Sequence, residues 1–235
     1  MFDWHDQHTY APAVKNVESV FLVGPGSASD WSPLLDDFLA ASADAGLSRV
    51  VMLSARGVEF LADGAVARAE ATLREGPLPW VILRPTHFAQ NFTEAMFRPI
   101  DGKITAPVGD GAEPFIDVAD IAEVAAAVLT TSHHDGEIVE LSGPESLTFH
   151  EAVAIINRHS GGHAQFVDED RAAHIERLRA AGTPDGYITW RMAMLDGIHS
   201  GADAYISDGV ERILHRPATG FSDWASREVL KLPHP

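Results

Sequence analysis

The stretch LPWVILRPTHFAQNF, residues 78–92, decides the fold of this 235-residue chain. Its residues 80–84 form a short apolar run, WVILR, which predicts a buried strand that ends at Pro85. The polar residues Thr86 and His87 follow that end directly. Ligands of open parallel sheets bind at the carboxyl ends of the strands, so this stretch predicts a sheet and a site together.

Similar strands flank this stretch on both sides. The other predicted strands are residues 20–23 (VFLV), 49–54 (RVVMLS) and 137–141 (EIVEL). Amphipathic helices with capping residues are predicted over residues 32–45, 63–74 and 117–129. Short apolar strands that alternate with helices are typical of βαβ units, so the chain is predicted to have an α/β fold with a parallel sheet.

The pattern changes after residue 162, where the chain becomes mostly helical. We therefore expect a core over residues 1–162 and a smaller, mostly helical C-terminal lobe over residues 163–235 that packs on this core and covers the substrate.

Composition excludes several classes of protein. The formal net charge is −17, from 17 Lys+Arg against 34 Asp+Glu, which argues against nucleic-acid partners and against an anionic membrane surface. The chain has no cysteine, so thiolate catalysis and cysteine-based metal sites are excluded. The polar N-terminus is unlike a signal peptide, and we expect a soluble protein of the cytoplasm.

Several stretches, taken together and in this order, resemble the NmrA-like family of atypical short-chain dehydrogenases/reductases. They are residues 17–25 (VESVFLVGP), 78–92, 115–129 (FIDVADIAEVAAAVL), 141–148 (LSGPESLT) and 216–224 (RPATGFSDW). The resemblance implies a doubly wound sheet, NAD(P)H binding and the reduction of quinones or other conjugated small molecules. Some members of the family sense the dinucleotide and regulate a partner.

The same resemblance places the pyrophosphate-binding turn of the family before Phe2. It therefore implies a Rossmann-like sheet that lacks its first βαβαβ half, roughly 50–60 residues at about 30 for each βαβ unit. In such a sheet the strand from Val20 to Val23 becomes an edge, and an unpaired apolar edge favours pairing with another chain. We expect a homodimer or higher oligomer that covers this edge.

Without that turn a dinucleotide loses its main phosphate anchors, so we expect no cofactor. The alternative is NADP bound at Gly24 and Gly26, which follow a strand in a turn close to the GxGxxG pattern. Ser29 replaces the third glycine of that pattern, and Pro25 removes one N–H group. Arg56, after the next strand, would then meet the 2′-phosphate.

The candidate catalytic residues are His87 and Ser54. Imidazole titrates near neutrality, which suits His87 to acid–base chemistry, and Ser54 ends a strand where short-chain dehydrogenases often place a catalytic serine. No Tyr and Lys four residues apart accompany them. The predicted substrate-binding residues are Thr86, Phe88, Gln90, Asn91, Tyr187, Trp190 and Met194. No metal site is expected, because the twelve histidines form no HExxH pattern.

Three functions follow from these residues. The first is a small-molecule enzyme that has lost dinucleotide binding and catalyses isomerisation, cyclisation or dehydration. The second is an NAD(P)H-dependent oxidoreductase, truncated or completed by another chain, that acts on a quinone or conjugated carbonyl. The third is a ligand-binding regulator without catalysis. The missing phosphate anchors favour the first.

Overall fold

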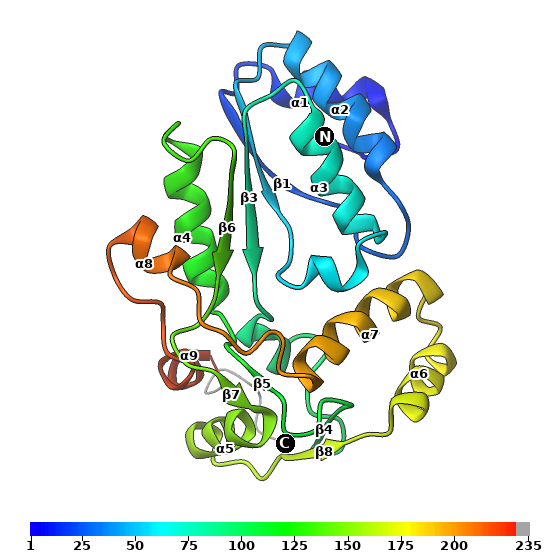
Figure 1. Ribbon diagram of the computed structural model, residues 1–235, viewed down its shortest axis with the longest axis vertical. Coiled ribbons are helices and arrows are strands. Elements are labelled where there is room, and N and C mark those ends of the chain that lie inside the picture. The colour runs from blue at the N-terminus through cyan, green and yellow to red at the C-terminus, as the bar shows by residue number, and fades with distance from the viewer. Residues whose placement is uncertain (229–235) are drawn as a thin grey trace.

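A parallel sheet of four strands lies at the centre of the computed structural model, which describes residues 1–228 (Figure 1). The strand order is β1 (Ser19–Val23), β2 (Arg49–Leu53), β3 (Trp80–Pro85) and β6 (Glu137–Leu141). All three neighbouring pairs are parallel. The predicted α/β fold with a parallel sheet is confirmed, and each of these strands begins and ends within one residue of its predicted limits.

Helices cover both faces of the sheet. On one face lie α1 (Tyr10–Val14), α2 (Ser32–Asp44) and α3 (Ala65–Glu75), and on the other lie α4 (Val118–Leu129) and α8 (Gly209–Leu214). Successive side chains of a strand point to opposite faces, so Val50 and Met52 pack against the first layer and Val51 against the second. This double cover explains why β2 and β3 are continuous apolar runs.

The N-terminal segment packs against α2. It contains the 3-10 helix η1 (Gln7–Thr9) and α1. Phe2, Trp4 and Tyr10 form edge and tilted ring contacts with Phe38, at centroid distances of 5.6 to 5.8 Å. Aromatic burial therefore fixes the segment onto the helix layer.

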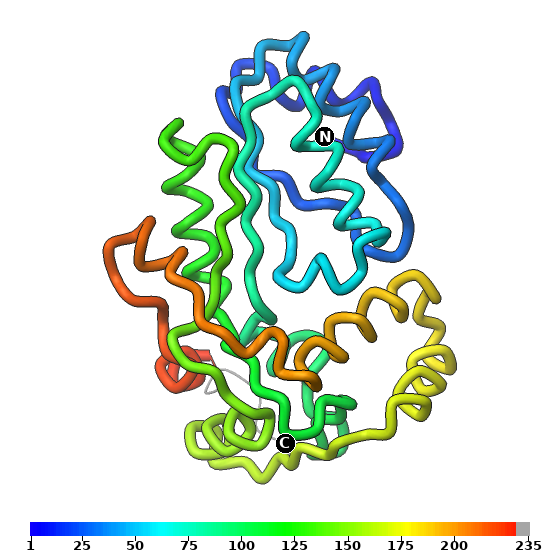
Figure 2. The backbone as a smooth tube through the Cα atoms, viewed as in Figure 1, coloured from blue at the N-terminus to red at the C-terminus, as the bar shows by residue number. Residues whose placement is uncertain are grey.

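A second lobe lies beyond the carboxyl ends of the strands (Figure 2). Its strands form two small pairs, β4 (Lys103–Ala106) with β8 (Gln165–Asp168) and β5 (Ala112–Glu113) with β7 (Leu147–Thr148). Its helical segments are η3 (Ala89–Phe92), α5 (Phe149–Ser160), α6 (Arg171–Ala180), α7 (Asp185–His199) and α9 (Phe221–Glu228).

The apolar core of this lobe combines residues from both sides of position 162. Phe92, Phe97 and Phe115 come from the connection after β3, and they pack with Phe149 and Phe221. The lobe therefore begins directly after β3, which differs from the division predicted at residue 162. Its short strands carry too few residues for their alternation to show in the sequence.

The helix α7 rests on the 3-10 helix η2 (Val58–Leu61), which follows β2. Two glycines make room for the Phe60 ring at this contact. A methyl group on Gly197 would lie 2.2 Å from that ring, and one on Gly57 would lie 2.7 Å from it. The lobe is thereby held close to the strand ends.

The strand β1 has a strand neighbour on one side only, within residues 1–228. Its side chains Phe21 and Val23 are 38% and 54% exposed. None of the helices in that range is long and apolar enough to cross a membrane.

Candidate active site

A cavity of about 250 Å³ lies at the carboxyl ends of β1, β2 and β3. Strand ends form its floor, and α7 of the lobe contributes Trp190 and Met194, which lie four residues apart on one helix face. Its walls are mainly apolar with a few polar groups, as is usual in small-molecule sites. Most predicted site residues line it: Gly24, Gly26, Ser54, Arg56, Thr86, His87, Phe88, Asn91, Trp190 and Met194.

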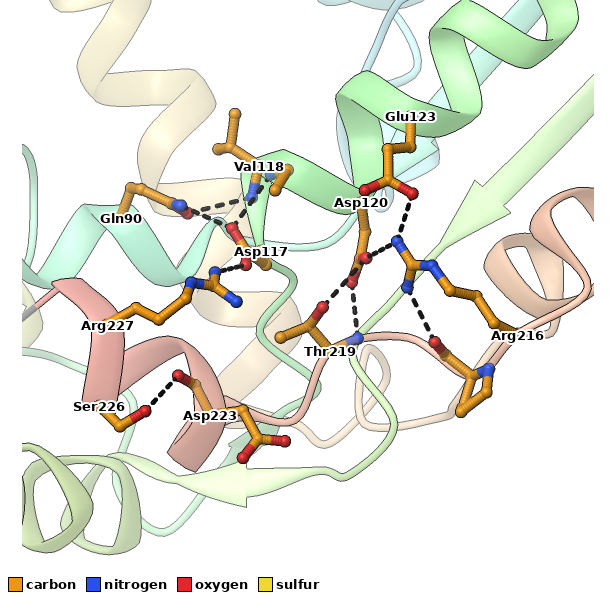
Figure 3. Close-up of polar contacts among 12 residues, drawn as sticks. Gln90, Asp117, Val118, Asp120, Glu123, Arg216, Thr219, Asp223, Ser226 and Arg227 are labelled. Carbon is orange, nitrogen blue, oxygen red and sulfur yellow. Dashed lines mark hydrogen bonds and ion pairs between the residues drawn. The ribbon is translucent and has the colours of Figure 1, made fainter.

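Two predicted substrate-binding residues are not among those that line this cavity. Gln90 fastens η3 to the start of α4: its amide nitrogen donates to Asp117 Oδ1 at 2.8 Å, and its Oε1 accepts from the Val118 N–H at 3.1 Å (Figure 3). The Tyr187 ring packs on Trp190 with centroids 5.8 Å apart.

Ser54 is bound to a buried ion pair. Its hydroxyl donates a very short hydrogen bond to Glu70 Oε1, and Arg84 donates to both oxygens of the same carboxylate at 2.9 and 2.5 Å. Glu70 is buried. Because the hydroxyl proton is used by Glu70, Ser54 can accept a hydrogen bond from a ligand in the cavity but does not donate one.

His87 is held by a buried carboxylate. Its ring Nδ1 lies 3.0 Å from Glu113 Oε1, and its backbone N–H donates to the same oxygen at 2.9 Å. Glu113, from β5, is 0% exposed. The opposite ring nitrogen, Nε2, makes no hydrogen bond within the part of the chain that the structure describes, and the ring lines the cavity.

Asp203 and Arg56 complete a buried polar cluster beside His87. Ligand atoms of His87, Glu113 and Asp203 lie within 4.8 Å of one another. Burial, and then the negative charge of Glu113, raises the pKa of Asp203 to about 7, although Arg56 and His87 act against this shift. We call His87, Glu113, Asp203 and Arg56 the buried cluster.

Arg56 serves as the counter-charge of this cluster. Its Nε lies 3.8 Å from Asp203 Oδ1, its Nη1 donates to the Tyr205 carbonyl at 2.6 Å, and its guanidinium lies 4.2 Å from the centre of the Tyr205 ring. The neighbouring carboxylates would repel a phosphate. The placement therefore favours a role in charge balance over the 2′-phosphate contact expected for Arg56.

The turn after β1 borders the cavity but is a weak phosphate cradle. A methyl group on Gly24 would lie 2.3 Å from the Trp31 ring, so this glycine makes room for the indole. Gly26 has a φ of 129°, a conformation that favours glycine, and a methyl group there would meet nothing within 4 Å.

Sequence reasoning missed Glu113 and Asp203. Residues 87, 113 and 203 follow no motif spacing, and only the fold brings them together. The only local sign of a buried acid was the position of Glu113 in the sequence, close to the apolar residues that follow Pro114. The expectation of no metal site stays a prediction, because His87, Glu113 and Asp203 offer ligand atoms at a suitable spacing.

A family model described as NAD(P)H-binding matches residues 1–132. An uncharacterised oxidoreductase of Bacillus subtilis, YesF, is 32% identical over 231 residues, which are 96% of this chain and 79% of that protein. The (4-alkanoyl-5-oxo-2,5-dihydrofuran-3-yl)methyl phosphate reductase of Streptomyces griseus is 30% identical over 92% of this chain and 78% of its own length.

Among solved structures, the chain is similar to an NADPH-dependent quinone oxidoreductase of Escherichia coli in complex with NADPH. The TM-score is 0.80 at 22% identity, over 97% of this chain and 82% of that one. At this identity the likeness concerns the fold.

These matches overturn two expectations. The absence of a cofactor and the cofactor-independent isomerase, cyclase or dehydratase are both wrong, because the matched family binds NAD(P)H and the named relatives are an oxidoreductase and a reductase. The error came from judging cofactor binding by the phosphate turn alone. The predicted loss of a first half of the sheet is not supported either, since the chain spans about four fifths of these relatives' length.

Proposed function

The chain belongs to the NAD(P)H-binding, NmrA-like atypical short-chain dehydrogenases/reductases, and on this basis we propose that it is an NAD(P)H-dependent oxidoreductase that reduces a quinone or another conjugated carbonyl compound. The observation that carries the proposal is the cavity at the strand ends with His87 on its wall. In doubly wound sheets this is where a dinucleotide and its substrate meet.

The residues of the cavity fit the nicotinamide end of the cofactor. Leu53 and Met194 offer apolar surface for a flat ring, and Ser27 and Asn91 offer polar groups for an amide. At about 250 Å³ the cavity is smaller than the roughly 300–1,000 Å³ that encloses a drug-sized ligand, so it suits one end of a dinucleotide. The bound cofactor would supply a hydride.

The chain's own residues would supply orientation and a proton. Trp31, Phe88 and Trp190 line the cavity with flat aromatic surface, which suits a conjugated substrate. Trp190 and Met194 line the cavity from the lobe with apolar surface, which would help to keep water from the reacting atoms. His87 would give a proton to the oxygen of the reduced substrate, because Glu113 fixes its ring with Nε2 free.

Calorimetric titration with NADPH and NADH tests the proposal. We expect one of them to bind at micromolar to submillimolar concentration, and a water-soluble benzoquinone to be reduced as the absorbance of the reduced nicotinamide falls. Failure of both cofactors to bind at millimolar concentration would refute the proposal. Binding without turnover of any quinone or enone would instead support a regulator.

A further inference from the structure

The buried cluster contains more ionisable groups than a single acid requires. Glu113 is 0% exposed, and Asp203 and Arg56 are each 3% exposed. Glu113 comes from β5, Arg56 from the segment after β2, and Asp203 from the segment after α7. Three segments that are far apart in the sequence therefore place ionisable side chains next to one another beside His87.

The buried cluster carries an uncompensated charge when both of its carboxyl groups are ionised. With a neutral imidazole, two ionised carboxylates face one guanidinium, which leaves one net negative charge among side chains that are almost wholly buried. An uncompensated buried charge is costly. In addition, Glu113 Oε2 is buried and has no hydrogen-bond partner in residues 1–228.

One proton removes that charge. A divalent cation would instead leave one net positive charge, and it would lie close to the guanidinium of Arg56, whose Nε is 3.8 Å from Asp203 Oδ1. Electrostatic repulsion from Arg56 therefore favours a proton over a metal ion as the occupant.

We propose that Glu113 and Asp203 hold one proton between them at neutral pH and act as the proton source for His87. The proposal rests on the reductase function proposed above. We assign the proton to the pair because ligand atoms of Glu113, Asp203 and His87 all lie within 4.8 Å of one another. In these terms Glu113 and Asp203 are positioning residues, and His87 is the group that touches the substrate.

The substrate receives two electrons with the hydride and then one proton: the Nε2–H bond of His87 breaks as the substrate O–H bond forms. A proton moves from the carboxyl pair to Nδ1 across the 3.0 Å contact with Glu113 Oε1. The imidazole stays neutral, the pair gains one negative charge, and solvent later returns the proton.

The pH dependence follows from the groups that face Asp203. These are Glu113, Arg56, His87, Glu59 and Tyr205. Burial of the site, and then the carboxylates of Glu113 and Glu59, raise the pKa of Asp203 to about 7, while Arg56 and His87 act to lower it. Because the acid form delivers the proton, turnover should fall as pH rises through this value.

Two isosteric variants test the relay. Glu113→Gln and Asp203→Asn keep side-chain shape and remove a titrating group. We expect each to lower kcat by about a hundredfold, at the lower end of the range of general acid catalysis, and to remove the decline near pH 7, with NADPH affinity unchanged. The control is Asp208→Asn, the same change at an exposed position of the same segment, which should alter neither property.

A second readout does not depend on turnover. Infrared difference spectra of the cofactor-free protein, taken across neutral pH, should show the carbonyl band of a buried carboxylic acid in the wild type and in Asp208→Asn. The band should be lost or shifted in Asp203→Asn and Glu113→Gln. Thermal unfolding of each variant confirms that it is folded before the spectra are compared.

The outcomes separate this proposal from the proposed function. Unchanged pH profiles and kcat in both folded variants, with NADPH-dependent turnover intact, would overturn the relay alone. Absence of turnover in the wild type would overturn the reductase, while the infrared band still reports on the proton. Zinc binding to the wild type that both variants abolish, with no acid band, would replace the proton by a metal and overturn the relay.

Discussion

Ser54 and His87 both line the cavity, but their hydrogen bonds give them different chemistry. The Ser54 hydroxyl donates to Glu70, which Arg84 also binds through two nitrogens. His87 turns one ring nitrogen to Glu113 and leaves the other without a partner in the described chain. Of the two predicted catalytic residues, only His87 is thus placed to give a proton to a ligand.

We expect Ser54→Ala to affect stability more than activity. The variant leaves Glu70 with one donor fewer in a buried position, which should lower the free energy of unfolding by about 1–3 kcal/mol. Turnover and its pH profile should stay close to those of the wild type. Urea unfolding and steady-state kinetics measure the two effects, and a large fall in kcat at unchanged stability would restore Ser54 to a catalytic role.

Gly24→Ala should disturb the rim of the cavity through Trp31. The added methyl group would lie 2.3 Å from the indole, and overpacking of this kind costs about 1–3 kcal/mol. Tryptophan fluorescence should shift as Trp31 moves. If the fluorescence spectrum and the free energy of unfolding of Gly24→Ala matched those of the wild type, the turn after β1 would have moved to accommodate the added methyl group.

At the scale of elements, the start of α4 connects the lobe to the sheet. Asp117 caps this helix by accepting from the Ala119 N–H at 3.0 Å, as its place before the apolar run predicts. It also accepts from Gln90 and, in a very short contact, from Arg227 of α9 (Figure 3). Asp120, one turn on, binds Arg216 and the Thr219 N–H. These two acids anchor the C-terminal segment.

Acid should weaken this anchor. Burial acts to raise the pKa of Asp117, but hydrogen bonds from Ala119, Gln90 and Arg227 outweigh it, so the pKa lies below its usual value. A carboxyl group with a lowered pKa contributes stability above its unfolded-state pKa of about 3.9, and this contribution is lost as pH falls further.

Asp117→Asn keeps the cap and removes the charge. We therefore expect a shallower loss of stability below about pH 4, while Asp117→Ala should lose about 1 kcal/mol or more at neutral pH as well. Thermal unfolding as a function of pH checks both. If the wild type and Asp117→Asn lost stability equally below about pH 4, the assignment of the acid sensitivity to Asp117 would be contradicted.

The elements themselves were largely predictable, because strands such as β3 and caps such as Asp117 depend on neighbouring residues. The connection between residues 86 and 117 was not. Its strands β4 and β5 have four and two residues, and their partners β8 and β7 lie far along the chain. Glu113 belongs to this connection, so its contact with His87 depends on tertiary pairing that local patterns do not encode.

At the scale of the whole molecule, the sheet has an open edge at β1 with Phe21 exposed. We propose that a second copy of the chain pairs there, since unpaired apolar edges favour association. Phe21→Lys should shift the protein towards monomer in sedimentation experiments. Val118→Lys, at an exposed valine of α4, serves as the control, and a monodisperse wild-type monomer at micromolar concentration would contradict the proposal.

The cofactor shows where whole-molecule reasoning from sequence failed. The expectation of no cofactor gave more weight to the missing phosphate motif than to the family resemblance in the rest of the chain. That expectation was wrong. Residues such as Thr86, His87 and Asn91 already marked the cavity in which we propose that the nicotinamide binds. The residues that line the cavity come from several strand ends and from the distant helix α7. The absence of one phosphate-binding turn is therefore a poor measure of cofactor binding.

The contact of Gly197 with Phe60 has a further consequence. Gly197 lies seven residues after Trp190 and three after Met194, on the same face of α7, yet it is not among the residues that line the cavity. A larger residue there would lift the helix from η2 and widen the space beneath it. Substrate range in this molecule can therefore evolve at a position that never meets the substrate.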